Sequence, residues 1–484
     1  MTNTHEQQLE RGTSVLEVPG HWIGGTVVAG PGDVRELLSP VDGRVVGRSP
    51  VGTPETVDRA VRAARAALPA WAATAPGARA EVLRRLADEL TRRQEEIAWA
   101  ITTEIGVPIS FSRAAQATFP AIVTAATAGL VDEVEWEAER GNALVVREPV
   151  GVVGAITPWN FPLQQTVTKI VPALLAGNAV VLKPAETSPL TGPILAEAAT
   201  AAGLPAGVLN IVYGDGPVVG EAIAAHPDVD MVSFTGSTAV GRHLAATAAR
   251  TVKKVALELG GKTAAILLDD ADLDRAIAET LQFAWSNAGQ ACGAWSRLLV
   301  PAARHDDVVR RLTAAAAAFA PGHPAEESTL VGPLASEAQW SRVNGYLETA
   351  VAEGAVVAYG GPGRIPGLEA GAFVRPTILT HVDPSSTIAQ EEVFGPVLSV
   401  LTYEDEADAL RIANGTAYGL TAAVYGDPAR ALSFARGLVA GQVYVNGAAF
   451  NPLAPFGGFR QSGVGREMGK EGVEEFTELK AILR

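Results

Sequence analysis

The sequence contains very few of the residues that build disulfides and metal sites. Among its 484 residues there is one cysteine, Cys292, and there are seven histidines. A single cysteine cannot form an internal disulfide or a four-thiolate site, and no two histidines have the HExxH spacing of a zinc enzyme. The sequence therefore predicts neither a disulfide framework nor a metal-dependent mechanism.

The chain also lacks an excess of basic residues and long apolar runs. Its 38 Lys and Arg residues face 53 Asp and Glu, a formal net charge of −15, which disfavours binding to nucleic acid or anionic membranes. The most apolar windows, 119–131 and 313–320, are shorter than the roughly 18 residues that cross a bilayer. The polar stretch 1–16 lacks the apolar core of a signal peptide. We expect a soluble, cytoplasmic protein without nucleic-acid or membrane partners.

The pattern along the chain is that of an α/β protein. With 48% hydrophobic and 19% charged residues, the composition is globular, and the length suits about three domains. From residue 152, short β-branched runs alternate with helical stretches. Strands of a first series are expected at 152–156, 179–182, 208–212 and 230–234, with helices at 189–202 and 216–225. Strands of a second series are expected at 264–268, 298–300, 397–401, 421–424 and 442–445, with helices at 273–288, 306–319, 407–413 and 428–438. Such alternation indicates parallel sheets covered by helices and predicts two α/β domains with a cleft between them.

Two other segments have recognisable patterns. Residues 53–100 have helical spacing and begin with Thr53-Pro54, a cap followed by a proline in the first turn. Residues 132–147 have the pattern of a β-hairpin that turns at Gly141-Asn142. A lone hairpin is marginally stable, so this one is expected to need a partner surface.

Cys292 is the first candidate for chemistry. A lone cysteine is most often a small buried hydrophobe. Gly289 and Gly293 flank this one in GQACGAWSR, and glycines let a substrate or cofactor approach the sulfur closely. From the residues alone, a buried thiol and a nucleophile both stay open.

Two polar residues are candidates to assist such a nucleophile. Glu258 ends an apolar run in LELGGK, and it can be a general base or the ion-pair partner of Lys262. Asn160 lies between two prolines in TPWNFP. Its amide can stabilise an oxyanion, although an Asx-turn is the commoner use of asparagine.

Three segments suit a nucleotide. Lys183 and Glu186 in KPAE can bind ribose hydroxyls, or they can be solvated loop charges. The strand, glycine turn and helix of FTGSTAVG (234–241) place backbone N–H groups where a pyrophosphate can bind. The acids of EEVFGP (391–396) can hold a second ribose, or they are a surface pair.

Together these segments resemble the NAD(P)-dependent aldehyde dehydrogenase superfamily over about residues 39–480. The matching motifs are PWNFP (158–162), KPAE (183–186), FTGSTAVG (234–241), LELGGK (257–262), GQACGAWSR (289–297), EEVFGP (391–396) and PFGGFRQSGVGRE (455–467). Each motif is modest alone, whereas their order and spacing are specific. The 34 positions between Glu258 and Cys292 match the family's spacing of base and nucleophile.

The resemblance implies an α/β fold with a Rossmann-like cofactor domain, an α/β catalytic domain and a small β oligomerisation element. On this chain the NAD-binding domain covers 1–130 and 149–257, and the catalytic domain covers 258–449. The oligomerisation element covers 131–148 and 463–484. Because family members are usually dimers or tetramers, a homodimer or homotetramer is expected.

The resemblance also implies a mechanism. Cys292 attacks an aldehyde as thiolate and gives a thiohemiacetal, whose oxyanion is held by the Asn160 amide and the backbone N–H of Cys292. Hydride transfer leaves a thioester, and Glu258 activates the water that hydrolyses it to the carboxylic acid.

The cofactor implied is NAD, with NADP as an alternative. A carboxylate at Glu186 can accept from the free 2′-hydroxyl of NAD and repel an added phosphate. The positions that match the family's cofactor contacts are Ile156, Thr157, Pro158, Trp159, Lys183, Glu186, Gly216, Phe234, Gly236, Ser237, Gly241, Leu259, Glu392 and Phe394.

The substrate pocket implied is roomy and partly aromatic. Its positions are Phe161, Gln164, Gln165, Thr168, Trp285, Ser286, Ala291, Gly293, Phe450 and Phe456. Several are small, three phenylalanines supply aromatic walls, and no arginine is present to hold a carboxylate. The hypothesis is a medium-to-large apolar or aromatic aldehyde, with polar contacts from the two glutamines.

Other functions compete with this one. A semialdehyde dehydrogenase is one alternative, and a CoA-acylating enzyme is another, although such relatives generally lack the base that Glu258 provides. A catalytically silent binding protein is disfavoured by the presence of Cys292, Glu258 and Asn160 together. A cofactor-independent thiol hydrolase would leave the ribose-binding acids without a purpose.

Overall fold

The structure is a computed structural model that describes residues 15–30 and 32–484. The predicted absence of a leader concerns residues that lie almost entirely outside this part. The first described strands form a three-stranded sheet, β1-β5-β4, from β1 (Leu16–Glu17), β5 (Val45–Pro50) and β4 (Val34–Leu38).

The first large sheet confirms the first predicted series of strands. Its order is β20-β12-β11-β8-β9-β10-β2-β3, and its central strands run parallel. They are β8 (Val152–Ile156), β9 (Ala179–Lys183), β10 (Leu209–Ile211), β11 (Met231–Thr235) and β12 (Lys254–Glu258). The edge strands β2 (His21–Ile23), β3 (Thr26–Val28) and β20 (Gly463–Val464) are antiparallel to their neighbours.

Both faces of this sheet are buried, which explains the continuous apolar runs. Alternate residues such as Val153 and Val180 pack on α3, α7 and α8, whereas Val152 and Val181 pack on α2, α9 and α10. These helices are α2 (Pro54–Ala72), α3 (Pro76–Arg92), α7 (Pro162–Ala176), α8 (Thr191–Ala201), α9 (Glu221–Ala225) and α10 (Thr238–Ala248).

The helical stretch predicted over 53–100 consists of three helices. Thr53 caps α2 and Pro54 is its first residue, as predicted. The chain breaks after Ala72 and again at Arg93, so α3 and α4 (Gln94–Ile105) follow as separate helices. Shorter helices let the chain wrap around the core.

A long apolar helix corrects the estimate of apolar length made from the sequence. Ile109–Asp132 combines α5 (Ile109–Phe111), a π-helical turn Ser112–Gln116, α6 (Thr118–Gly129) and a final 3₁₀ turn. Its 24 residues are long and apolar enough to cross a membrane, and 61% of its most apolar window is buried within the fold. It packs along α3 and α7, a position typical of a core helix.

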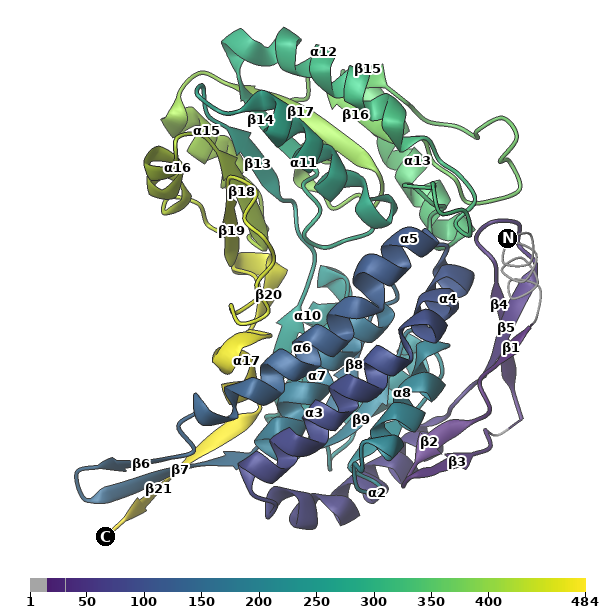
Figure 1. Cartoon of the computed structure of the whole chain (residues 1–484), viewed down its shortest axis with the longest axis vertical. Coiled ribbons are helices and arrows are strands. Elements are labelled where there is room, and N and C mark those ends of the chain that lie inside the picture. Colours follow the sequence, from purple (N-terminus) through teal and green to yellow (C-terminus); the bar gives the residue numbers. More distant parts are fainter. Residues whose placement is uncertain (1–14, 31) are drawn as a thin grey trace.

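The second large sheet has the order β15-β16-β17-β14-β13-β18-β19. It is parallel except for β15. Its strands are β13 (Ala264–Leu267), β14 (Arg297–Pro301), β15 (Val356–Tyr359), β16 (Thr377–Thr380), β17 (Val397–Tyr403), β18 (Thr421–Tyr425) and β19 (Gln442–Val445). Its helices are α11 (Leu273–Trp285), α12 (His305–Ala316), α13 (Glu337–Ala352), α14 (Thr387–Gln390), α15 (Glu406–Ala413) and α16 (Pro428–Ala435). Figure 1 shows this unit stacked above the first.

One predicted helix of the second series is too long. The stretch 273–288 was expected to be helical, but α11 ends at Trp285. Asn287 and Ala288 have left-handed backbones with φ of 52° each. These conformations end the helix and turn the chain toward Cys292, an outcome that helical spacing cannot reveal.

The predicted hairpin is present and has a partner strand. β6 (Glu137–Arg140) and β7 (Ala143–Pro149) flank the turn at Gly141-Asn142, and β21 (Thr477–Leu483) pairs with β7. The three strands project from the body as an arm (Figure 1).

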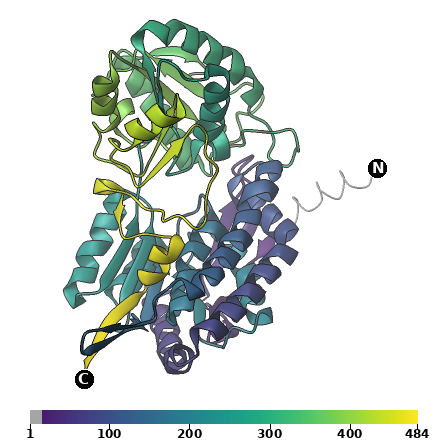
Figure 2. The same cartoon turned by 60° about the vertical axis from the view of Figure 1, so that its left-hand side comes forward.

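The C-terminal boundary of that arm differs from the prediction of 463–484. Gly463 and Val464 pair with β12 at the edge of the first sheet, and α17 (Gly469–Glu474) packs against α7. Only the last strand joins the hairpin. Figure 2 shows the chain after β19 descending from the second unit to the first before it reaches the arm.

Candidate active site

The candidate residues come from opposite ends of the two sheets. In the first sheet they follow the carboxyl ends of the strands, as is usual for ligand sites in parallel sheets: Asn160 follows β8, Ser237 follows β11, and Glu258 is the last residue of β12. In the second sheet Cys292 precedes β14 and Glu392 precedes β17. The site therefore lies between the two units.

A cavity of about 190 Å³ is lined by ten of the predicted residues. The predicted residues that line it are Pro158, Trp159, Asn160, Gln165, Gly236, Ser237, Leu259, Cys292, Glu392 and Phe394. The nucleophile candidate, the oxyanion candidate and part of the cofactor set are thus brought together.

Four further residues line the same cavity and were missed: Thr235, Gly260, Gln339 and Arg342. Gln339 donates to the Phe394 carbonyl at 2.7 Å, and Arg342 donates to the Glu392 carbonyl at 2.9 Å. Both lie on α13, where their spacing is that of any polar helix face, so no signal in the sequence distinguishes them.

Asn160 is held by its neighbours and does not form an Asx-turn. Its Nδ2 donates to the Gln290 carbonyl at 2.9 Å. Its own carbonyl accepts from Gln116 Nε2 and from Asn287 Nδ2, each at 2.9 Å. Since Gln290 lies two residues before Cys292, these bonds tie the Asn160 amide to the loop that carries the thiol.

Glu258 is not the ion-pair partner of Lys262, so that sequence-based alternative is wrong. The Glu258 side chain is buried, and neither carboxylate oxygen has a hydrogen-bond partner within the described residues. Burial and the nearby Glu467 carboxylate raise its pKa well above the ordinary value. Glu467 pairs with the buried ammonium of Lys169.

The thiol of Cys292 lies in the same electrostatic surroundings. Burial raises its pKa, and the carboxylates of Glu258, Glu392 and Glu467 raise it further. Burial also raises the pKa of Glu392 to about 7. Each of these groups is therefore easier to keep protonated than in water, and removing the thiol proton requires a base of matched pKa.

Lys262 has a different role in the fold. Its side chain is buried, and burial together with the Arg297 guanidinium lowers its pKa to about 7. The Arg297 side chain in turn donates to the carbonyls of Lys262, Ile412 and Ala413. These bonds hold the LELGGK loop against the second unit.

The residues predicted to bind adenosine form a charged group apart from the cavity. Lys183 Nζ lies 2.9 Å from Glu186 Oε2, and an ion pair between Arg35 and Asp215 lies close by. Lys183 and Arg35 lower the pKa of Glu186 against the opposing effect of burial. Gly216 follows directly after Asp215 and begins a π-helical turn.

The glycine turn after β11 fits a pyrophosphate. Gly236 donates to the Glu258 carbonyl at 3.0 Å, and Ser237 caps α10. A Cβ at Gly241 would lie 2.4 Å from a Leu259 methyl, so the close packing requires glycine here. The free N–H groups at the start of α10 face the cavity edge that Ser237 lines.

The other predicted cofactor residues divide between core and cavity wall. Ile156 and Phe234 are buried in the core beneath the loops, and the buried hydroxyl of Thr157 has no partner within the described part of the chain. The rings of Trp159 and Phe394 meet edge to face at 5.4 Å.

The predicted substrate residues are placed unevenly. Phe161 contacts Phe111, and Phe450 contacts Phe119, with ring centroids 6.5 and 5.6 Å apart. Phe111 and Phe119 come from the long helix and were not predicted.

The remaining residues predicted for the substrate pocket have other contacts. Phe456 exchanges backbone hydrogen bonds with Glu467, and the Thr168 hydroxyl donates to the Gln165 carbonyl. Ala291 and Gly293 flank Cys292, while Gln164, in the first turn of α7, and Ser286, just after α11, are partly exposed.

Trp285 does not fit its predicted place. It is fully buried in the core of the second unit, with its ring edge to face with Phe319 at 5.2 Å. The last turn of α11 directs the side chain into that core, because the chain leaves the helix only after this residue.

No group of three or more His, Cys, Asp and Glu side chains suitable for a metal ion occurs within residues 15–30 and 32–484.

Comparison with known proteins identifies the class. The Aldehyde dehydrogenase family matches residues 28–482, and the chain belongs to that family. It is similar to a 3-succinoylsemialdehyde-pyridine dehydrogenase from Pseudomonas sp, with 46% identity over 93% of this chain and 94% of the relative.

Solved structures agree on the fold. An aldehyde dehydrogenase C mutant from Pseudomonas syringae, in complex with NAD+ and octanal, has a TM-score of 0.95 at 44% identity and covers 96% of each chain. An aldehyde dehydrogenase from Mycobacterium tuberculosis in complex with NAD+ has a TM-score of 0.95 at 42% identity, over 97% of this chain and 99% of the other. The fold is that of aldehyde dehydrogenases, and the protein is an enzyme of this family.

Proposed function

We propose that the protein oxidises an aldehyde to the carboxylic acid, with NAD as hydride acceptor and Cys292 as the nucleophile. The observation that carries this proposal is the single cavity lined by Cys292, Asn160, Glu392 and Phe394. It places a thiol, an amide donor and the predicted nicotinamide contacts on one surface. The buried carboxylate of Glu258 lies in the electrostatic reach of the thiol.

The thiol proton is removed first, because only the thiolate is strongly nucleophilic. Sγ then bonds to the aldehyde carbon and the carbonyl electrons move to oxygen, which gives a tetrahedral thiohemiacetal. The Asn160 amide, fixed by its bond to the Gln290 carbonyl, donates one hydrogen bond to this oxyanion. The backbone N–H of Cys292 donates the second.

NAD, when bound, would supply the acceptor for the hydride. Collapse of the oxyanion leaves a thioester on Cys292. Glu258 then takes a proton from water, which attacks the thioester and releases the acid and the thiolate. A carboxylate with a raised pKa is a stronger base than an ordinary one, which suits this step.

NAD fits the residues present. Glu186 can accept hydrogen bonds from the adenosine ribose, the turn at Gly236 and Ser237 can hold the pyrophosphate, and Glu392 with Phe394 can contact the nicotinamide half. The relatives crystallised with NAD+ support this choice. We expect kcat/KM with NAD to exceed that with NADP; a clear preference for NADP would contradict it.

The substrate we propose is a medium-to-large apolar or aromatic aldehyde. The aromatic pairs Phe161–Phe111 and Phe450–Phe119 support a wall that suits such a chain or ring. One similar structure was solved with octanal, and another is an indole-3-acetaldehyde dehydrogenase of Pseudomonas syringae in complex with NAD+ and IAA.

A semialdehyde is the second candidate substrate. This class is favoured by the similarity to a protein named 3-succinoylsemialdehyde-pyridine dehydrogenase. That name also includes a pyridine ring, so it agrees with an aromatic substituent. Acyl transfer to coenzyme A is disfavoured by the presence of Glu258.

The division of labour within the chain follows from the same proposal. The unit built on the first sheet binds NAD, the unit built on the second carries the nucleophile, and the three-stranded arm joins subunits of a homodimer or homotetramer. A cytoplasmic location stays a prediction from the sequence.

A panel of aldehydes of graded size tests the substrate. NADH formation is followed for acetaldehyde, octanal, phenylacetaldehyde and succinic semialdehyde. We expect the highest kcat/KM for octanal or phenylacetaldehyde. The highest value for acetaldehyde or succinic semialdehyde would contradict the proposed class.

A further inference from the structure

A π-helical turn interrupts the long helix beside the candidate active site. It covers Ser112–Gln116, and the Ala117 N–H donates to the Ser112 carbonyl, five residues earlier, at 2.8 Å. In a regular α-helix, residues five positions apart such as Phe111 and Gln116 point about 140° away from each other. A π-turn holds about one more residue than an α-turn and brings such a pair close to one face. Turns of this kind are frequent at functional sites.

Phe111 and Gln116 contact two successive residues of the PWNFP loop. The Phe111 ring meets the Phe161 ring with centroids 6.5 Å apart. Gln116 Nε2 donates to the backbone carbonyl of Asn160 at 2.9 Å. Because the π-turn brings Phe111 and Gln116 close to one face, the long helix holds an aromatic residue and the oxyanion candidate at the same time.

The backbone carbonyl of Asn160 is held from two sides. It accepts from Gln116 on the long helix and from Asn287 Nδ2 on the loop before Cys292, each at 2.9 Å. The Asn160 side chain donates to the Gln290 carbonyl at 2.9 Å. Since a carboxamide nitrogen has two hydrogens, one is left for an oxyanion in the cavity that Asn160 and Cys292 line. The direction of that hydrogen depends on how the Asn160 backbone is held.

Gln116 is not explained by packing alone. Its side chain is 1% exposed, and its Oε1 is buried without a hydrogen-bond partner among residues 15–30 and 32–484. A buried acceptor without a donor costs free energy that an apolar side chain of similar size would avoid. Gln290, in contrast, is paired at both ends of its carboxamide. A side chain that departs from good packing in this way is typical of a functional position.

We propose that Gln116 is a positioning residue for the oxyanion donor. Its carboxamide holds the Asn160 backbone so that the free N–H of the Asn160 side chain points at the substrate oxygen. The inference rests on the proposed function, because it takes Asn160 as the oxyanion donor. Gln116 does not line the cavity itself, so its effect on catalysis passes through Asn160. Small shifts are sufficient, since a displacement of about 1 Å can cost about 10²-fold in rate.

A double-mutant cycle tests the inference. The enzymes are the wild type, Gln116→Met, Asn160→Ala and the double variant, and kcat and KM for octanal are measured at saturating NAD. The matched control is Thr124→Val in both backgrounds. Thr124 is also buried in the long helix, and its hydroxyl donates to the Pro120 carbonyl of the same helix at 2.7 Å. Tm is measured for every variant.

Asn160→Ala removes the oxyanion donor and should lower kcat by about 10²- to 10³-fold. Gln116→Met should lower kcat and kcat/KM equally, by about tenfold, because the lost interaction acts in the transition state. In the Asn160→Ala background it should have no further effect. Thr124→Val should leave kcat unchanged in both backgrounds. The Tm of Gln116→Met should not fall, because methionine removes the unpaired oxygen and the Asn160 carbonyl keeps Asn287 as a donor.

Two outcomes overturn the inference and leave the proposed function standing. One is an unchanged kcat in Gln116→Met, and the other is an equal loss in both backgrounds, which is what a merely structural role gives. Gln116→Leu repeats the cycle with a second apolar side chain, so a packing defect peculiar to methionine does not decide the result. If Asn160→Ala oxidises octanal as fast as the wild type, the oxyanion assignment fails together with the inference.

Discussion

The two large sheets of this enzyme contribute to the candidate active site from opposite ends of their strands. In the first sheet the loops at the carboxyl ends of the strands carry Asn160, Glu186 and Ser237, in keeping with the general rule for such sheets. In the second sheet the segments before the strands carry Cys292 and Glu392. The proposed nucleophile and nicotinamide contact on this unit thus precede the strands, at the side that faces the first unit.

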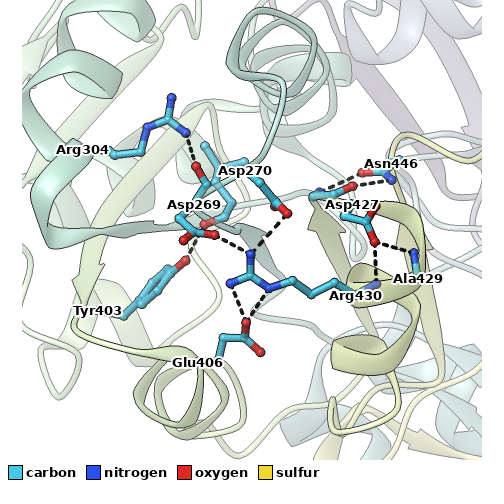
Figure 3. Close-up of polar contacts among 11 residues, drawn as sticks. Asp269, Asp270, Arg304, Tyr403, Glu406, Asp427, Ala429, Arg430 and Asn446 are labelled. Atoms are coloured by element: carbon cyan, nitrogen blue, oxygen red, sulfur yellow. Dashed lines mark hydrogen bonds and ion pairs between the residues drawn. The ribbon is translucent and has the colours of Figure 1, made fainter.

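The carboxyl ends of the second sheet are occupied by a charge network instead. Arg430 bonds with Asp269 and Asp270, which follow β13, and with Glu406, which follows β17. Tyr403, at the end of β17, donates to the Leu267 carbonyl at 2.6 Å. Figure 3 shows Asp269, Asp270 and Glu406 converging on Arg430. Exposed ion pairs of this kind connect loops and contribute modestly to stability.

The direction in which parallel strands run therefore does not by itself locate a functional site. In this protein one sheet contributes residues that follow its strands to the cavity, and the other contributes residues that precede its strands. Substitutions at the amino end of the second sheet and at the carboxyl end of the first should therefore affect catalysis. Substitutions in the charge network around Arg430 should not.

The largest effect is expected for Cys292→Ala. Without Sγ no covalent adduct forms, so kcat/KM for NADH formation should fall by roughly 10⁴-fold or more. NAD binding, followed by quenching of tryptophan fluorescence, should persist because the fold is unchanged. Substantial residual oxidation would show that the nucleophile lies elsewhere.

Glu258→Gln should slow the later half of the reaction. Loss of the general base should reduce steady-state turnover by about 10²- to 10⁴-fold. Rapid mixing should still show a burst of about one NADH per subunit, because the thioester forms and then persists. Equal loss of burst and turnover would instead assign Glu258 to activation of the thiol.

Glu186→Gln should weaken NAD binding without stopping chemistry. Losing a charged acceptor for the ribose should raise the KM for NAD about tenfold and improve NADP relative to NAD. The kcat at saturating NAD is the internal control. An unchanged cofactor preference would remove Glu186 from the ribose contacts.

Glu467→Gln should shift the pH dependence of kcat. The Glu467 carboxylate raises the pKa of Glu258, and Lys169 lowers it. The substitution removes the first effect and frees the Lys169 ammonium from its partner, so both changes lower the pKa of Glu258. The rise of kcat with pH should therefore move to lower pH, with thermal unfolding measured alongside to confirm folding. A shift to higher pH would contradict this electrostatic account.

The smallest effect is expected for Arg430→Met. Its ion pairs lie at the exposed carboxyl ends of the second sheet, so Tm should fall by only about 1–3 °C and kcat/KM should stay as in the wild type. A marked loss of kcat/KM would break the comparison, because it would place function at both ends of that sheet.

Much of the architecture could be predicted, because strands that are buried on both faces have continuous apolar sequences. The strands at 152–156 and 442–445 appear with the predicted bounds. The end of α11 could not be predicted, since left-handed Asn287 and Ala288 are not marked by glycine. Nor could β20, whose two residues pair with β12 only because the chain returns to the first unit.

The residues of the candidate site also divide into those that the sequence predicts and those that it does not. Cys292, Asn160 and Glu258 stand in local motifs whose spacing is visible in the sequence, and the first two line one cavity. Gln339 and Arg342 look like any polar residues of a helix and enter the cavity only because α13 packs there. Trp285 lies in the sequence beside the catalytic loop yet points into the core.

The sequence by itself determined the family and the succession of strands along the chain, and it predicts Cys292 as nucleophile and Glu258 as general base, because these inferences depend on residue type and local spacing. Only the tertiary structure decided that Glu258 does not pair with Lys262 and that the charges of Glu467 and Lys169 act on its pKa. Burial, charge and hydrogen bonding depend on residues far apart in the chain, and folding alone brings them within reach of one another.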